Sequence, residues 1–207
     1  MKSILKISAF ALVLVLFSSS CAKTFYSVDS KALSQKHRSV AIMPSIVAIS
    51  SMGANRKVAT EVLERQEAIE AQSFQQAVHA WMQKRKLEGK TTVEIQDIEI
   101  TNARLKDAGY PETLLTNAKI CEILGVDAII VSNFELSKPM TFEEAIALTI
   151  VLGIVFASDE VIGTIGISDC AENKLIWSYR HKISGYSPIA VVEAFMKKAS
   201  RKMPYVN

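Results

Sequence analysis

Histidines are the first side chains in this sequence whose chemistry could support metal binding or proton transfer. They are His37, His79 and His181. None has a ligand partner at the helical spacing of three or four residues, and no His-Glu-x-x-His pattern is present. His181 could line a site together with Trp177 and Tyr179, but we interpret it as a strand histidine with satisfied hydrogen bonds. We therefore predict no metal, no cofactor and no enzymatic activity.

The cysteines Cys121 and Cys170 are the next candidates. Cys121 shares a predicted helical face with Leu114 and Ala118, which favours a buried small hydrophobe. Cys170 falls in a predicted turn, where we expect it to be exposed, with only Lys174 near enough in sequence to lower its pKa. A bridge between the two cysteines is the alternative for an oxidising compartment, but a mid-helix residue and a turn residue need not meet.

Cys21 differs from both because of what precedes it. Lys2 and Lys6 are followed by an apolar run over 7–17, three serines and then Cys21. A basic start, a short apolar core and small residues are typical of a secretory signal, and the run is too short to span a membrane as a helix. The cysteine directly after the small residues makes the stretch resemble a bacterial lipoprotein signal. This predicts a signal peptide over 1–20 and a lipid, such as palmitate, on the thiol of Cys21.

Other patterns that could indicate a site have simpler structural explanations. Glu143 and Glu144 follow Thr141 as a capping box, and adjacent residues do not converge on a helix. Gly163 and Gly166 lie within a strand pattern, so they do not form a phosphate-binding loop. No Gly-x-Ser-x-Gly nucleophile elbow is present.

The mature chain would be close to neutral. The formal charge of +3 loses Lys2 and Lys6 with the signal, which gives no reason to expect a nucleic-acid partner. Its length suits one domain with a substantial core. The polar stretch 21–38 has no steady period and is interpreted as a lipidated tether, with the periplasmic domain covering 39–207.

Strands alternate with helices along that domain. The predicted elements are a strand over 39–46, a helix over 56–87, a strand over 91–96, helices over 100–108 and from Pro111 to Gly125, a strand over 128–134, a helix over 145–157, a hairpin of strands 161–167 and 175–183, and a helix from Ser187. This order predicts an α/β fold: a mixed, mostly parallel sheet of about five strands covered by helices, with a C-terminal antiparallel hairpin and a final helix.

Several segments carry a resemblance to known families. They are SVAIMP at 39–44, VEIQDIEITNARLKDAG at 93–109, LGVDAIIVSNF at 124–134, KLIWSYRHKISG at 174–185 and AFMKKASRKMP at 194–204. Residues 39–205 resemble the periplasmic domain of curli-export lipoproteins and the N-terminal domain of the TolB translocation protein. A further resemblance is to small lipoproteins of Bacteroides-type bacteria. These segments mark a fold, so the resemblance implies an envelope domain but no catalytic residues.

The run AIALTIVLGIVFA at 145–157 is the feature that a simple domain does not require. A helix that is apolar on all sides must be buried on all sides or meet a partner. Core burial, a protein or oligomer contact and membrane contact are the alternatives. If the run meets a partner, the contact residues are Leu148, Val151, Leu152 and Val155. Curli exporters cross the membrane with amphipathic strands, so we do not carry a pore over to this helix.

Together these features predict an outer-membrane-anchored lipoprotein on the periplasmic face. It would contact the membrane through lipid on Cys21 and would bind a protein partner or a second copy as a binding or assembly module, with no nucleic acid. The alternatives are a subunit of an export pore, and an envelope hydrolase or small-ligand binder. The basic residues near the end of the final helix could touch lipid headgroups, although compensation of the helix dipole also explains them; these residues are Lys197, Lys198, Arg201 and Lys202.

Overall fold

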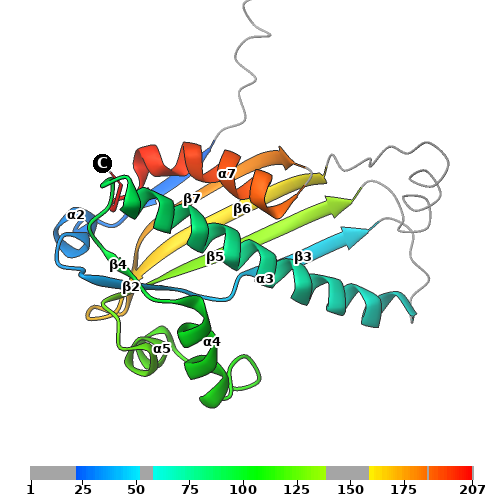
Figure 1. Cartoon of the computed structure of the whole chain (residues 1–207), viewed down its shortest axis with the longest axis horizontal. Helices are drawn as coiled ribbons and strands as arrows, with labels where there is room; N and C mark the ends of the chain where they lie inside the picture. Colours follow the sequence, from blue (N-terminus) through cyan, green and yellow to red (C-terminus); the bar gives the residue numbers. More distant parts are fainter. Residues whose placement is uncertain (1–21, 52–57, 139–158, 186, 207) are drawn as a thin grey trace, which may run out of the picture.

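The computed structural model describes residues 22–51, 58–138, 159–185 and 187–206 (Figure 1). The predicted signal peptide, Cys21 and the predicted apolar helix with Leu148, Val151, Leu152 and Val155 lie outside these residues. Within the described ranges, no helix is long and apolar enough to cross a membrane.

The described strands form one mixed sheet in the order β1-β7-β6-β5-β2-β4, and β3 also pairs with β5. The strands are β1 (Lys23–Tyr26), β2 (Ser39–Ile42), β3 (Ile46–Ser51), β4 (Glu94–Ile95), β5 (Ala128–Lys138), β6 (Asp159–Asp169) and β7 (Lys174–Gly185). The pairs β1–β7, β7–β6 and β6–β5 are antiparallel, whereas β2 pairs parallel with β4 and β5, and β3 pairs parallel with β5. The α/β class and the C-terminal hairpin are confirmed, in a sheet with more strands and more antiparallel pairing than expected.

Helices cover both faces of this sheet. They are α2 (Ser30–Ser34), α3 (Val58–Leu87), α4 (Ile98–Asp107), α5 (Asn117–Leu124) and α7 (Pro188–Ala199), followed by the 3-10 turn η1 (Ser200–Lys202). In Figure 1, α3 and α7 lie side by side across one face, and α4 and α5 lie together near β2. The final helix begins as predicted, because the Ser187 hydroxyl accepts the Ala190 N–H at 3.3 Å and Pro188 occupies the first turn.

The larger core lies between the sheet and the helices α3 and α7. Phe74 from α3 and Phe134 from β5 stack with ring centroids 4.0 Å apart, and Phe195 from α7 packs against Phe134 edge-on. Gly163 makes room for this packing, because a Cβ there would come within 2.8 Å of the Phe195 ring. Trp177 on β7 is completely buried in the same core, as its place in the alternating strand predicts.

A smaller core lies under α4 and α5. Its buried residues are Ala41, Met43, Leu105, Ile120, Cys121, Leu124 and Ile129. Gly125 ends α5 in the left-handed conformation at φ 64°, as predicted. The predicted start of this helix at Pro111 is wrong: α5 begins at Asn117, because the Thr116 side chain accepts the Lys119 N–H and caps the helix there.

The prediction that the stretch 21–38 is a tether and that folding starts at Ser39 is also wrong. Strand β1 pairs antiparallel with β7, with Lys23 opposite Arg180 and Tyr26 opposite Trp177. Ala22 packs against the larger core. A four-residue edge strand is held by backbone hydrogen bonds to its neighbour and does not need an apolar period, which is why the polar sequence concealed it.

Candidate functional site

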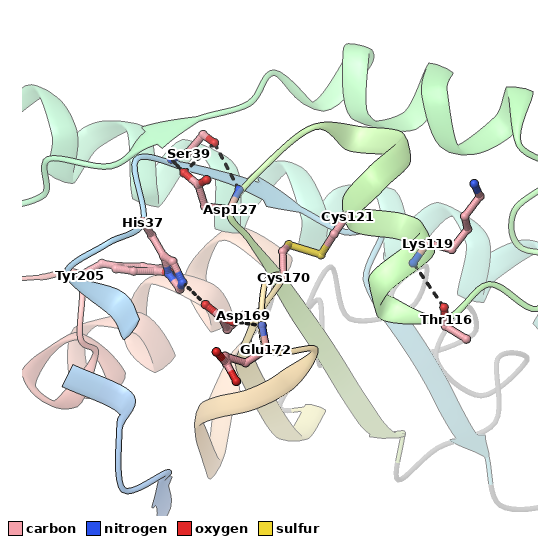
Figure 2. Close-up of a disulfide and its surroundings, with 10 residues drawn as sticks. All are labelled: His37, Ser39, Thr116, Lys119, Cys121, Asp127, Asp169, Cys170, Glu172 and Tyr205. Carbon is pink, nitrogen blue, oxygen red and sulfur yellow. Dashed lines mark hydrogen bonds and ion pairs between the residues drawn. A yellow bond between two sulfur atoms is a disulfide. The ribbon is translucent and has the colours of Figure 1, made fainter. Parts of the chain in front are cut away.

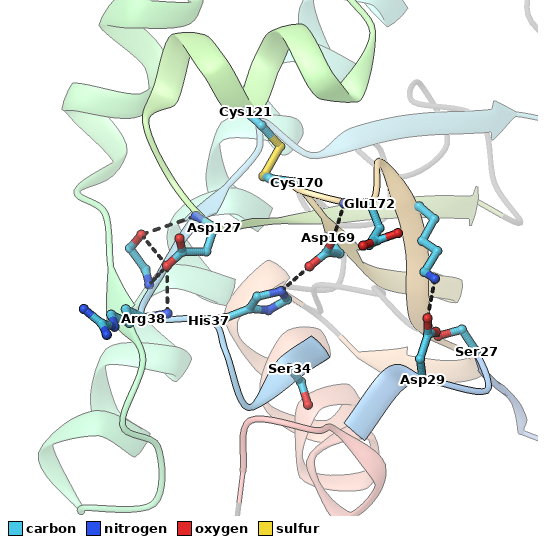
Figure 3. Close-up of polar contacts among 12 residues, drawn as sticks. Ser27, Asp29, Ser34, His37, Arg38, Cys121, Asp127, Asp169, Cys170 and Glu172 are labelled. Carbon is cyan, nitrogen blue, oxygen red and sulfur yellow. Dashed lines mark hydrogen bonds and ion pairs between the residues drawn. A yellow bond between two sulfur atoms is a disulfide. The ribbon is translucent and has the colours of Figure 1, made fainter. Parts of the chain in front are cut away.

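A buried polar cluster of His37, Asp169 and Tyr205 joins three distant parts of the chain. The His37 Nε2 atom lies 2.6 Å from Asp169 Oδ2, and its Nδ1 atom lies 2.5 Å from the Tyr205 hydroxyl. His37 follows α2, Asp169 ends β6, and Tyr205 lies just beyond η1. All three side chains are buried, and Figures 2 and 3 show His37 pointing toward Asp169. We call these three residues the His37 cluster.

The charges around the His37 cluster determine which atom donates each hydrogen bond. Burial, and then the negative charges of Asp169 and Asp127, raise the pKa of Tyr205 far above its ordinary value. Tyr205 therefore keeps its proton and can donate it to Nδ1 of His37. The Asp169 carboxylate can only accept, so Nε2–H donates to it. The second oxygen of Asp169 accepts the Glu172 N–H at 2.6 Å, which fixes the turn after β6.

Asp127 makes a second polar connection beside the cluster (Figure 3). Its Oδ2 atom accepts the backbone N–H groups of Arg38 at 2.7 Å and Ser39 at 2.9 Å. Burial acts to raise the pKa of Asp127, but these donors and the Ser39 hydroxyl outweigh it and hold the pKa below its ordinary value. Asp127 thus stays charged and fixes the start of β2 against the start of β5.

A disulfide joins Cys121 and Cys170 next to Asp169 (Figure 2). The bridge corrects our expectation of a small buried hydrophobe and an exposed turn cysteine. Cys121 is on the inward face of α5, and the Cys170 N–H donates to the carbonyl of Asp127 at 3.0 Å, so the two Cα atoms lie 5.6 Å apart. This spacing suits a disulfide, and it results from long-range packing that the sequence pattern does not reveal.

His37 and Tyr205 of this cluster line a cavity of about 650 Å³. Most of its lining is polar, and it includes Tyr26, Ser30, Lys31, His37 and Tyr205. The Ser30 hydroxyl is buried without a hydrogen-bond partner among the described residues. Within the described ranges the His37 side chain bonds to Asp169 and Tyr205, which occupy both ring nitrogens. The cluster therefore holds α2, β6 and the C-terminal turn together, and it presents no activated nucleophile to the cavity.

The other histidines do not join this site. His181 lies in a buried row with Trp177 and Tyr179 on β7, and its Nε2 atom lies 2.8 Å from the Lys198 amine. Burial, and then the charge of Lys198, lower the pKa of His181. His79 on α3 also has a pKa lowered by burial. In the described part of the chain, no group of three or more His, Cys, Asp or Glu side chains could hold a metal ion.

No protein-family model matches this sequence, and no curated protein matches it significantly. Similar folds occur among solved structures. The lipoprotein GNA1162 from Neisseria meningitidis shares 11% identity at a TM-score of 0.46, over 79% of this chain and 96% of that one. The PelC dodecamer from Paraburkholderia phytofirmans shares 8% identity at 0.44, over 91% and 99%. The LpoB C-terminal domain from Salmonella enterica shares 13% identity at 0.35, over 75% and 96%. All these TM-scores are below 0.5, and the likeness concerns only the general arrangement of strands and helices.

Sequence reasoning missed the His37 cluster because it assigned His37 to a tether. One signal was present: His37 comes two residues before the predicted strand at 39–46, and Asp169 and Cys170 come just after the predicted strand at 161–167. Strand β5 lies between β2 and β6, parallel to β2 and antiparallel to β6, so the start of β2 and the end of β6 lie at the same edge of the sheet. Tyr205, by contrast, reaches the cluster only through the packing of α7 and η1.

Proposed function

We propose that this protein is a lipid-anchored component of the bacterial cell envelope whose α/β domain acts as a binding or assembly module. The observation that carries the proposal is the pairing of its cysteines. The sequence has three, and Cys121 and Cys170 are joined to each other. Cys21, directly after the signal-like stretch, is thereby the one cysteine left for lipid attachment.

The disulfide also supports a location outside the cytoplasm. Structural disulfides persist in oxidising compartments such as the periplasm and are rare where thiols are kept reduced. A secretory signal and a disulfide in the same chain support the same compartment independently. The outer membrane, on its periplasmic face, is the site that we propose for the anchored protein.

Substitution of Cys21 tests the anchor. Cys21→Ser should move the protein from the membrane fraction to the soluble periplasm, and mass spectrometry of the wild-type N-terminal peptide should show attached acyl chains. Cys170→Ser is the matched control, because it is the same change at another cysteine but should leave the protein in the membrane fraction. A Cys21→Ser protein that still sediments with membranes after a high-salt wash would refute lipid anchoring.

The assembly role is tested at the predicted apolar helix. Leu148→Glu or Leu152→Glu should weaken crosslinking to a partner or second copy while the melting temperature is kept, because an unpaired charge in a buried contact is costly. Ala157→Glu, at the end of the same run, provides a comparison. If every glutamate in the run unfolds the monomer, the run is ordinary core and this part of the proposal fails.

A further inference from the structure

We propose that one edge of the domain lies against the anionic headgroups of the membrane that holds the protein. This edge consists of β1, the turn after it and α2, over residues 23–34, and we call it the N-terminal edge. The inference rests on the proposed lipid on Cys21. It adds the orientation of the domain and names the lipid surface as the second contact besides the acyl chains.

Covalent connectivity places the N-terminal edge beside the anchor. Cys21 is bonded to Ala22, and consecutive Cα atoms lie about 3.8 Å apart. Ala22 is packed against the larger core, and Lys23 already pairs with Arg180 in the sheet. The folded domain therefore begins one residue after the lipidated position, and β1 must lie close to the plane in which the acyl chains insert.

The N-terminal edge exposes large apolar side chains in the way that interfacial segments do. Phe25 is 46% exposed and Tyr26 is 50% exposed, and Val28 in the following turn is fully exposed. Phe25 and Tyr26 point to opposite faces of an edge strand, so a surface that meets the strand edge-on contacts both. Aromatic side chains at the headgroup level are typical of proteins that sit at a membrane interface.

The charged groups on and beside this edge are mostly cationic. Lys23 and Lys31 are exposed, and neither side chain has an acidic partner among the described residues. The one acid on the edge, Asp29, already binds Lys174. An anionic surface would therefore meet lysines that are free to interact with phosphates, each contributing about fivefold to the equilibrium.

The C-terminal turns add to the same charged surface. The Lys202 amine donates to the Thr24 hydroxyl at 3.2 Å, and the Tyr26 hydroxyl donates to the Lys202 carbonyl at 2.6 Å. Lys198 lies one helical turn before Lys202 and reaches His181 on β7. These lysines extend sideways toward β1 and β7 instead of capping the carbonyls of their own helix, so dipole compensation does not explain where their amines lie.

The opposite side of the molecule lacks this composition. The α4–α5 region combines the cations Arg104, Lys106 and Lys119 with several acids, which are Glu99, Asp107, Glu112 and Glu122. Lys119 is paired with Glu122 at 2.9 Å. Leu114 is fully exposed between the two helices and provides a reference position away from the N-terminal edge.

The orientation can be measured with one engineered thiol in the full-length, lipidated protein. Cys121 and Cys170 are bonded and Cys21 carries lipid, so Val28→Cys adds the single thiol that a polarity-sensitive fluorophore can label. The labelled protein is reconstituted into vesicles of phosphatidylcholine alone, or of phosphatidylcholine mixed with phosphatidylglycerol. Leu114→Cys, labelled in the same way, is the control.

We expect the Val28 label to shift to the blue and to be quenched by nitroxide-labelled lipid in vesicles that contain phosphatidylglycerol, while the Leu114 label does neither. Lys23→Glu combined with Lys31→Glu should lower the docked-to-undocked ratio by at least twenty-five-fold, which is about fivefold for each lysine lost. Lys106→Glu combined with Lys119→Glu makes the same charge change on the far side and should have no effect. High salt should weaken docking by screening.

Three results would overturn the inference. If the protein floats with the vesicles but its Val28 and Leu114 labels behave alike, the anchor is real and the orientation is wrong. If the Val28 label is shielded but not quenched by lipid nitroxides, a second copy or another protein covers the edge. If the protein carries no acyl chain and does not float, the proposed anchoring fails, and the orientation fails with it.

Discussion

The two faces of the sheet are stabilised in different ways. The face under α3 and α7 has a large continuous core with stacked aromatic rings, and no disulfide crosses it among the described residues. The face under α4 and α5 has only seven buried apolar or cysteine residues, and there a disulfide ties α5 to the turn after β6.

The difference shows where covalent support is useful. A helix of eight residues such as α5 buries too little apolar surface to hold its position firmly, and a cross-link that restricts the unfolded chain compensates. The long helix α3 buries much more and needs none. Four changes test this comparison, beginning with the largest expected effect.

Removing the largest side chain of the larger core should cost the most. Trp177→Ala should lower the free energy of unfolding by ~3–5 kcal/mol, because Trp177 is completely buried and leaves a cavity. Urea denaturation measures this loss. Trp177→Phe is the control and should cost clearly less, because the indole N–H has no hydrogen-bond partner among the described residues. An unchanged stability in Trp177→Ala would show that the core under α3 and α7 does not hold the domain together.

Removing the disulfide should cost somewhat less and should act locally. The double substitution Cys121→Ala with Cys170→Ala should lower the free energy of unfolding by ~2–4 kcal/mol, since the bridge closes a loop with a sequence separation of 49. Hydrogen exchange should quicken in α5 before it quickens in α7. Equal acceleration in both helices would contradict the contrast between the two faces.

The His37 cluster should matter to an intermediate degree, because it joins segments from both sides of the molecule. Tyr205→Phe should cost ~1–2 kcal/mol, because the Nδ1 atom of His37 loses its buried donor. Thermal melting measures the change. Tyr110→Phe removes a hydroxyl outside the cluster and should leave the melting temperature nearly unchanged. The same small effect in both variants would mean that the Tyr205 hydroxyl contributes nothing.

A pH dependence should be the smallest effect, and it should arise on the face with the larger core. His181 has a pKa lowered by burial and by Lys198, so the unfolded state takes up a proton more readily than the folded state. Stability should therefore fall as the pH drops below the unfolded value of about 6.5. His181→Gln should reduce the fall in melting temperature between about pH 6.5 and 5, and the remaining fall comes from His79, whose pKa is also lowered by burial. If the melting temperature of the variant falls as much as that of the wild type, His181 does not contribute.

The regular elements could be predicted because each has a local cause. The alternation of Trp177, Tyr179 and Ile183 identified β7, Gly125 marked the end of α5, and Ser187 with Pro188 marked the start of α7. These signals depend on residues within a few positions of one another. Packing against distant segments did not have to be known.

The polar connections could not be predicted for the opposite reason. His37 is brought together with Asp169 and Tyr205 from far apart in the chain, and each residue is unremarkable in its own neighbourhood. The disulfide was not expected because a mid-helix residue and a turn residue need not meet, and only the packing of α5 on the sheet brings Cys121 to Cys170. Strand β1 is only four residues long, so its strand-favouring Thr, Phe and Tyr residues were too few to identify it, and its place comes from pairing with β7.

The pairing of β1 with β7 has a consequence for how far the domain could search for a partner. If residues 22–38 were unfolded, a lipidated domain could lie up to roughly 60 Å from the bilayer, at about 3.4 Å per residue. With β1 in the sheet, that reach falls to the length of a residue or two. A partner would have to come to the membrane surface, where confinement to a thin layer raises the effective concentration of both molecules.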